Sequence, residues 1–116
     1  MIDFIKSFQY AFRGVQIAWS GRNFRVQLAA AFLVVGLGVW FQISGTEWMV
    51  LMLTIGSILS MEIMNSAVEE LVNFVSPEFH PLAGKIKDLA AGAVLVLSLV
   101  SVVIGLMVFY PYLIEL

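Results

Sequence analysis

The chain has 116 residues, of which 61% are hydrophobic and 12% are charged, and its formal net charge is −2. Ordinary soluble domains are about 45–50% apolar and about 25% charged, so this composition excludes a disordered tail and a basic nucleic-acid-binding protein. Cysteine is absent, which also excludes a disulfide-bonded secreted scaffold. What remains is a small all-α integral membrane protein, with a single domain over residues 1–116 and room for about three spanning helices.

Residues 2–20 have the pattern of an amphipathic helix. Apolar side chains recur there at steps of three and four residues, which places them on one face of a helix. These side chains are Ile5, Phe8, Phe12, Val15 and Trp19. Because polar and basic residues occupy the opposite face, we expect this helix to lie in the membrane surface.

Three apolar stretches follow, and each predicts a transmembrane helix. They cover about residues 26–43, 48–75 and 88–110, and a helix of about 20 residues crosses a hydrocarbon core of roughly 30 Å. We expect Gly84 to mark the turn before the third span and Pro111 to end that span.

The basic residues predict the orientation. All six of them precede the first span or lie between the second and the third. The positive-inside rule then places the N-terminus and the second connection in the cytoplasm, and the C-terminus outside.

The second span carries a polar stripe on one face, at steps of three, four and four residues. Its members are Glu62, Asn65, Glu69 and Asn73, and we use the term polar stripe for these four residues. If Trp48 marks the outer interface, Glu62 lies about 21 Å along the helix, or about 9 Å inside the cytoplasmic boundary of a roughly 30 Å core. Glu69 lies about 10 Å further along, near the headgroups.

A carboxylate inside the membrane costs at least about 2.5–3.5 kcal/mol, so it needs a partner, a metal or a proton. Two carboxylates and an amide offer the hard oxygen ligands that Mg²⁺ prefers, and a deep Glu62 could act as a general base at headgroup depth. Two alternatives remain open. The stripe could join helices in an oligomer through hydrogen bonds, or Glu62 could carry protons in a small transporter.

Further polar residues lie near the predicted cytoplasmic side. Lys87 could reach a phosphate across the gap to Glu69, whereas Lys85 is more typical of a topology anchor. His80 is the only histidine, and a lone histidine in a connection is more often solvated than a ligand. The sequence has no Walker P-loop or soluble-kinase glycine loop.

Five segments together resemble the prokaryotic diacylglycerol kinase and undecaprenol kinase family. Residues 62–69, 78–80 and 87–92 match its signature, and residues 10–14 and 23–25 also resemble it. The resemblance runs in order from about Lys6 to Phe109, which is nearly the whole chain.

This resemblance implies a homotrimer of three-span protomers, each with an N-terminal surface helix, in the bacterial inner (cytoplasmic) membrane. It implies Mg²⁺-dependent transfer of the γ-phosphate of ATP to a membrane lipid alcohol, either diacylglycerol or undecaprenol. The sites of the family lie between protomers near the cytoplasmic face. No nucleic-acid partner is expected.

The resemblance also assigns roles by position. Glu62 matches the residue proposed to take the proton of the lipid hydroxyl, and Glu69 matches a carboxylate that holds the Mg²⁺ of MgATP. The other matched positions correspond to nucleotide or phosphate contacts and to surface-helix positions of the family. They are Lys6, Tyr10, Arg13, Asn65, Glu78, His80, Lys87 and Asp88.

Two positions depart from the family pattern. Gly21 stands where the family usually has a glutamate that helps to bind the metal, and Asn73 stands where it often has an aspartate. Loss of a metal carboxylate could weaken Mg²⁺ binding, transfer that role to another residue, or mark a catalytically inactive relative. The Asn23–Arg25 segment resembles the undecaprenol-type branch, but the acceptor stays open between the two lipids.

Overall fold

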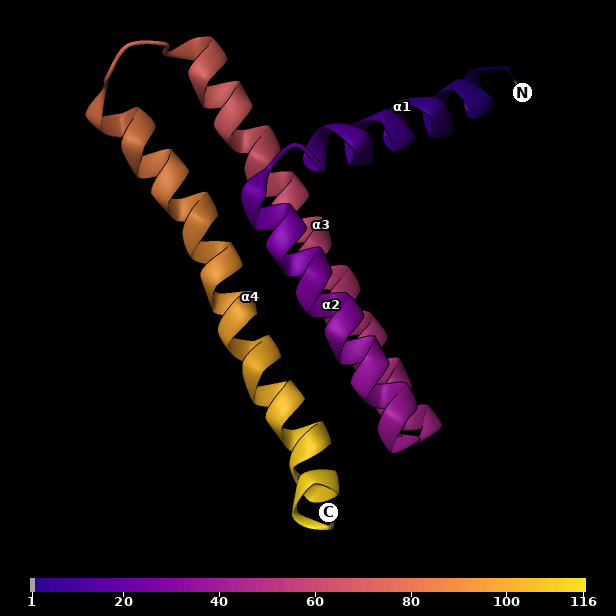
Figure 1. Ribbon diagram of the computed structural model, residues 1–116. Helices are drawn as coiled ribbons and strands as arrows, with labels where there is room; N and C mark the ends of the chain where they lie inside the picture. The colour runs from indigo at the N-terminus through magenta and orange to yellow at the C-terminus, as the bar shows by residue number, and fades with distance from the viewer. Residues whose placement is uncertain (1) are drawn as a thin grey trace.

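The structure is a computed structural model that describes residues 2–116, and it consists of four helices joined by short connections (Figure 1). They are α1 (Ile2–Ala18), α2 (Arg22–Phe41), α3 (Gly45–Val75) and α4 (Pro81–Ile114). Three of them, α2, α3 and α4, are long and apolar enough to cross a membrane. The predicted all-α membrane fold is therefore confirmed, and the trimer stays a prediction.

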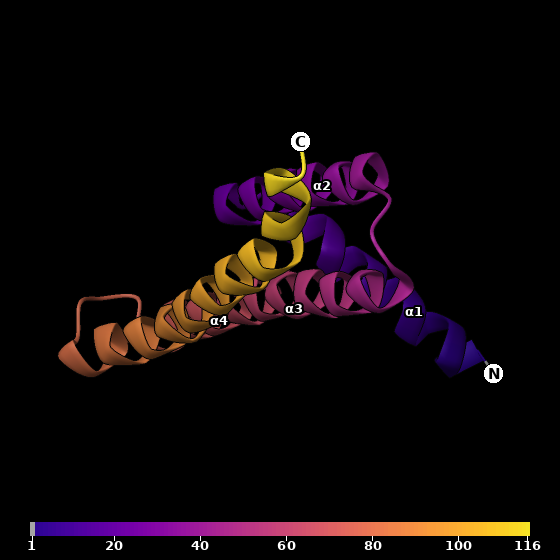
Figure 2. The ribbon, with the colours of Figure 1, turned by 90° about the horizontal axis from the view of Figure 1, so that it is seen from below.

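The three long helices run side by side, and α1 projects from them at an angle (Figure 1). The α3–α4 connection lies toward the same end as α1, whereas the α2–α3 connection and the C-terminus lie at the other end. Helix α3 packs against both α2 and α4, and the view from below shows α4 crossing from α3 toward α2 (Figure 2). Since the six basic residues lie in α1 and at the starts of α2 and α4, this arrangement gathers them toward one end.

Helix α1 leaves its apolar face uncovered by protein. Phe8 and Phe12 are 63% and 67% exposed, and Ile5 is 52% exposed. Ala18 is buried and Gly14 half-buried, so small residues form the side toward the bundle. An uncovered apolar face is what a helix in the membrane surface requires. The helix ends at Ala18, two residues before the predicted end.

Caps at both ends of the α2–α3 connection set the helix boundaries there. Helix α3 begins at Gly45, three residues earlier than predicted, because Ser44 and Glu47 form a capping box. The Glu47 backbone N–H donates to Ser44 Oγ at 3.2 Å, and the Ser44 N–H donates to Glu47 Oε1 at 2.9 Å. Helix α2 begins at Arg22 and ends at Phe41, and Gln42 reverses the chain with a φ of 53°.

Two sequence predictions about α4 are wrong. Gly84 lies inside the helix rather than in a turn, because His80 caps the helix and Pro81, seven residues before the predicted start of the span, occupies its first position. Pro111 does not end α4, which continues to Ile114. A proline in the last turn removes one hydrogen bond only, and Tyr112 anchors that turn by donating a hydrogen bond to Glu47 Oε1.

The apolar core of the protomer lies at the end far from α1. Ile43, Leu51, Val108 and Phe109 are its buried members, and the rings of Phe41 and Phe109 lie 6.2 Å apart. This core joins α2, α3 and α4 at one end of the bundle and thereby fixes the register of α3, which carries the polar stripe at the other end.

Candidate active site

The polar stripe continues the buried face of α3 toward the end where α1 lies. Leu51 is buried on this face, and Glu62 and Asn65 follow it with only 5% and 6% of their surface exposed. Glu69 is exposed. The stripe therefore runs from a buried carboxyl to an accessible one on a single helix face, as the sequence spacing predicts.

Asn65 and Glu69 are joined by a hydrogen bond along the helix. Asn65 Nδ2 donates to Glu69 Oε1 at 3.3 Å. The other polar atom of the amide, Asn65 Oδ1, is buried and has no hydrogen-bond partner within residues 2–116. A buried carbonyl oxygen without a partner is costly. This atom is therefore suited to coordinate a cation or to accept a hydrogen bond from a ligand.

Gln27, on α2, is a polar neighbour of Glu62 that the sequence analysis missed. Its side chain lies near the Glu62 carboxyl, while Gln27 Oε1 is buried without a partner within residues 2–116. The available signal was a polar residue directly before the uninterrupted apolar run that begins at Leu28. Polar side chains inside a membrane span are costly and commonly face other helices.

Lys87, at the start of α4, reaches the stripe from the side. Its Nζ donates to Asn73 Oδ1 at 2.6 Å, which joins α4 to α3 one helical turn beyond Glu69. Lys87 therefore lies beside the accessible end of the stripe, with Asn73 as its hydrogen-bond acceptor. Its contact with a phosphate stays a prediction.

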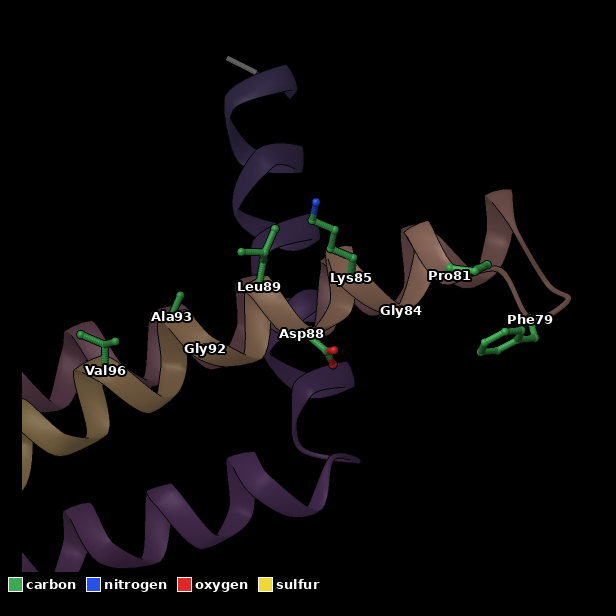
Figure 3. A pocket seen from close by; sticks show the side chains of 9 residues that line it. All are labelled: Phe79, Pro81, Gly84, Lys85, Asp88, Leu89, Gly92, Ala93 and Val96. Atoms are coloured by element: carbon green, nitrogen blue, oxygen red, sulfur yellow. The ribbon is translucent and has the colours of Figure 1, made fainter.

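Asp88 faces a different direction. It lines an open groove of about 760 Å³ along α4, together with Lys85, Gly92 and Phe79. Figure 3 shows Lys85 and Asp88 pointing to opposite sides of the helix. Lys87 does not line this groove, so the protomer separates two residues that the sequence analysis grouped at one site.

The remaining predicted nucleotide contacts lie in α1 and in the α3–α4 connection. The Arg13 guanidinium lies 6.0 Å from the centre of the Tyr10 ring, and Lys6 is exposed on the same helix. His80 Nδ1 accepts the Leu82 N–H at 3.1 Å as a helix cap, and Glu78 is exposed. Within residues 2–116, no hydrogen bond joins these five side chains to the polar stripe.

The chain offers few ligands for a metal. The part of the chain that the structure describes has no cluster of three His, Cys, Asp or Glu residues that could hold an ion. Mg²⁺ is usually bound by one or two carboxylates together with substrate phosphates. The exposed Glu69 carboxylate and the unpaired Asn65 Oδ1 supply one carboxylate and one further oxygen ligand, which fits a Mg²⁺ site that substrate phosphates complete.

Gly21 stands at the N-cap of α2, where no side chain caps the helix. A Cβ built at this position would lie 3.3 Å from the Ala18 carbonyl oxygen. The backbone there is extended, with φ −81° and ψ 134°, so any residue can adopt it. A larger side chain needs only a small adjustment of the turn after α1.

The amino-acid sequence matches that of a known protein family. The sequence model of prokaryotic diacylglycerol kinase matches residues 9–109. The chain belongs to the prokaryotic diacylglycerol kinase family. Membership in this family makes the protein a lipid kinase, and with its three apolar helices it is a multi-pass membrane protein.

Several bacterial proteins are similar to this family member over most of their length. It is 43% identical to the undecaprenol kinase of Bacillus subtilis over 109 residues, covering 93% of this chain and 89% of the relative. It is 31% identical to the diacylglycerol kinase of Escherichia coli over 100 residues, covering 85% and 82%. It is 34% identical to the diacylglycerol kinase of Helicobacter pylori over 92 residues, covering 78% and 72%.

Proposed function

We propose that this lipid kinase transfers the γ-phosphate of ATP, with Mg²⁺, to the hydroxyl of a lipid alcohol at the cytoplasmic face of the bacterial inner membrane. The observation that carries the proposal is the burial gradient of the polar stripe. Glu62 is 5% exposed inside the bundle, whereas Glu69 is accessible at the end where the basic residues gather. Such a gradient suits a reaction between a membrane-embedded hydroxyl and a water-soluble phosphate donor.

Undecaprenol is the acceptor that the comparisons favour. Identity to the undecaprenol kinase of Bacillus subtilis is 43%, against 31% to the diacylglycerol kinase of Escherichia coli. Diacylglycerol remains the second acceptor to be assayed.

In the proposed mechanism, Glu62 takes the proton of the lipid hydroxyl. The hydroxyl oxygen then attacks the γ-phosphorus, the bond from that phosphorus to the bridging oxygen of the β-phosphate breaks, and ADP leaves. The proton later passes from Glu62 to water. Phosphoryl transfer depends mainly on positioning and on neutralising charge, so a buried carboxylate beside the acceptor contributes as a general base.

Glu69 and Asn65 would hold the metal. When bound, Mg²⁺ neutralises phosphate charge and orients the nucleotide. The Lys87 ammonium adds a positive charge one turn away, and Asn73 holds it there at 2.6 Å. Together these side chains draw the phosphate end of the nucleotide toward Glu69.

A homotrimer is part of the proposal. Asp88 lies in the open groove of α4, which Lys87 does not line, and α1 leaves Lys6, Tyr10 and Arg13 exposed. These positions would complete a nucleotide site if a neighbouring protomer presented them to the polar stripe. The small residues of the α4 groove, such as Gly92 and Ala93, would allow close helix approach.

The test is a kinase assay on the full chain in lipid bicelles. Purified protein receives labelled ATP, Mg²⁺ and either undecaprenol or diacylglycerol, and phosphorylated lipid is measured. We expect product with undecaprenol. Absence of product from both lipids would refute the proposed function and would agree with an inactive relative.

Three variants test the roles of the carboxylates. We expect Glu62→Gln to abolish turnover and to leave MgATP binding intact, and Glu69→Gln to weaken MgATP binding. Glu70→Gln is the matched control, because Glu70 is exposed on the same helix and lies outside the stripe. Normal turnover and normal MgATP binding in both stripe variants would show that the assigned roles are wrong.

A further inference from the structure

The three long helices enclose an internal cavity of about 130 Å³, which we call the slot. The space exists because small residues line it on two helices, Ala30 and Ala31 on α2 and Gly105 on α4. On α3 the side chains of Ile55 and Ile58 line it. Most of the wall of the slot is therefore hydrocarbon.

The slot lies on the same face of α3 as Glu62. Ile55, Ile58 and Glu62 follow one another at steps of three and four residues, so their side chains lie one above the other on the helix. A rise of 1.5 Å per residue separates the backbones of Ile58 and Glu62 by only about 6 Å. Since Glu62 is buried, a lipid whose hydroxyl meets this carboxyl from the membrane side has the slot directly beside that hydroxyl.

The polar atoms of the slot offer little to an ester group. Thr54 Oγ1 donates to the Val50 carbonyl at 2.7 Å, and Ser101 Oγ donates to the Leu97 carbonyl at 2.7 Å, so both hydroxyl hydrogens are already engaged within their own helices. Gln27 Oε1 is buried without a partner within residues 2–116, and this acceptor cannot pair with an ester carbonyl. Because burying an unpaired carbonyl is costly, the slot favours a molecule that is pure hydrocarbon next to its hydroxyl.

The size of the slot suits a small hydrocarbon group. An apolar cavity of about 150 Å³ in another protein stays dry and binds benzene, and the slot is of similar volume. One isoprenoid unit is close to benzene in size. Ala30 lines the slot and is also exposed on the surface of α2, so a chain can enter there from the bilayer.

We propose that the slot receives the hydrocarbon next to the hydroxyl of the lipid acceptor and thereby selects a polyprenol over a diacylglycerol. In a polyprenol, the isoprenoid unit beside the hydroxyl has no polar atom. A diacylglycerol carries ester groups on the carbon atoms beside its hydroxyl-bearing carbon. This inference rests on the proposed function, because it requires the lipid hydroxyl to meet Glu62.

The first experiment fills the slot and compares Ala31→Leu with Ala29→Leu in the full chain. Ala31 is half-buried and lines the slot, so a leucine there would occupy part of it. Ala29 is exposed on the same helix and does not line the slot, which makes it the matched control. For each variant, kcat/KM for undecaprenol, kcat/KM for diacylglycerol and the KM for ATP are measured in bicelles.

We expect Ala31→Leu to lower kcat/KM for undecaprenol about tenfold or more, which corresponds to losing the burial of about two carbon groups. The values for diacylglycerol and ATP should stay close to those of the parent chain, and Ala29→Leu should resemble the parent throughout. An unchanged kcat/KM for undecaprenol in Ala31→Leu would overturn the inference. Equal losses with the two lipids, or equal losses in the two variants, would overturn it as well.

A second experiment uses the parent chain and does not depend on the folding of a variant. A polyprenol with a photoreactive diazirine on the isoprenoid unit beside the hydroxyl is irradiated with the protein, and the modified residues are mapped by mass spectrometry. We expect adducts at Ala31, Ile55 or Ile58 that excess undecaprenol suppresses. Adducts confined to α1 or to the groove of α4 would overturn the inference. A parent chain that phosphorylates neither lipid would refute the proposed function itself, whereas adducts in the slot would still show that it holds the hydrocarbon.

Discussion

The contact between Gly38 and Trp48 predicts a large effect from a single methyl group. Gly38 is buried on α2 where the indole ring of α3 packs against it. A Cβ added to Gly38 would lie 2.7 Å from Trp48 Cη2, 3.0 Å from Trp48 Cζ2 and 3.1 Å from Ile43 Cδ1. Carbon atoms in optimal contact are about 3.5–4.0 Å apart, so in Gly38→Ala the ring would have to retreat by roughly 1 Å.

The ring has little room for this movement. Trp48 packs against the buried cluster of Ile43, Leu51, Val108 and Phe109, which joins all three long helices. Overpacking of a core of this kind costs about 1–3 kcal/mol. Apart from the helix propensity that alanine gains over glycine, we expect Gly38→Ala to lower the free energy of unfolding by that amount. The kcat of the folded enzyme should not change, because Leu51 of this core lies about 16 Å before Glu62 along α3.

The assay is reversible unfolding in mixed micelles, with denaturing detergent as the titrant and tryptophan fluorescence as the signal. Gly36→Ala is the matched control, because a Cβ at Gly36 has no heavy atom within 4 Å. Both variants replace glycine by alanine inside α2 and share the gain in helix propensity, so the difference between them isolates the steric term. Equal stability of the two variants would refute the packing argument.

Two further predictions concern the site. Gly21→Glu should raise the Mg²⁺ affinity in the kinase assay, because it restores the carboxylate that is typical of the family. The turn can take the side chain, since a Cβ at Gly21 would lie 3.3 Å from the Ala18 carbonyl oxygen. An unchanged Mg²⁺ dependence would show that another group already fills this role. Lys87→Met should raise the KM for ATP about tenfold or more. Lys85→Met, which alters the α4 groove instead, is the control and should change this KM less than twofold. Equal effects of the two substitutions would show that Lys87 does not have the proposed role.

The fold was predictable where hydrophobicity alone decides it. Three apolar runs gave three spans, but their ends were displaced because caps lie outside the apolar stretches. The Ser44–Glu47 box extends α3 upstream, and the His80 cap starts α4 before Gly84. Pro111 predicted a helix end because proline lacks a donor, and the tertiary contact of Tyr112 with Glu47 outweighs that local preference.

The site was predictable along a single helix and less so between helices. A spacing of three and four residues is enough to place Glu62, Asn65 and Glu69 on one face of α3, and the structure buries the first two. Gln27 belongs to another helix, and its position near Glu62 depends on the register of α2 against α3. No pattern within one helix encodes that register, so this proximity required the packed structure.

The positions of the core and the polar stripe explain how a small membrane protein can bury a carboxyl group. The apolar cluster around Leu51 joins α2, α3 and α4 at one end of the bundle, and hydrophobic packing there does not require Glu62. The register of the helices is thus fixed away from the polar stripe. Substitutions in the core should therefore change stability without changing turnover.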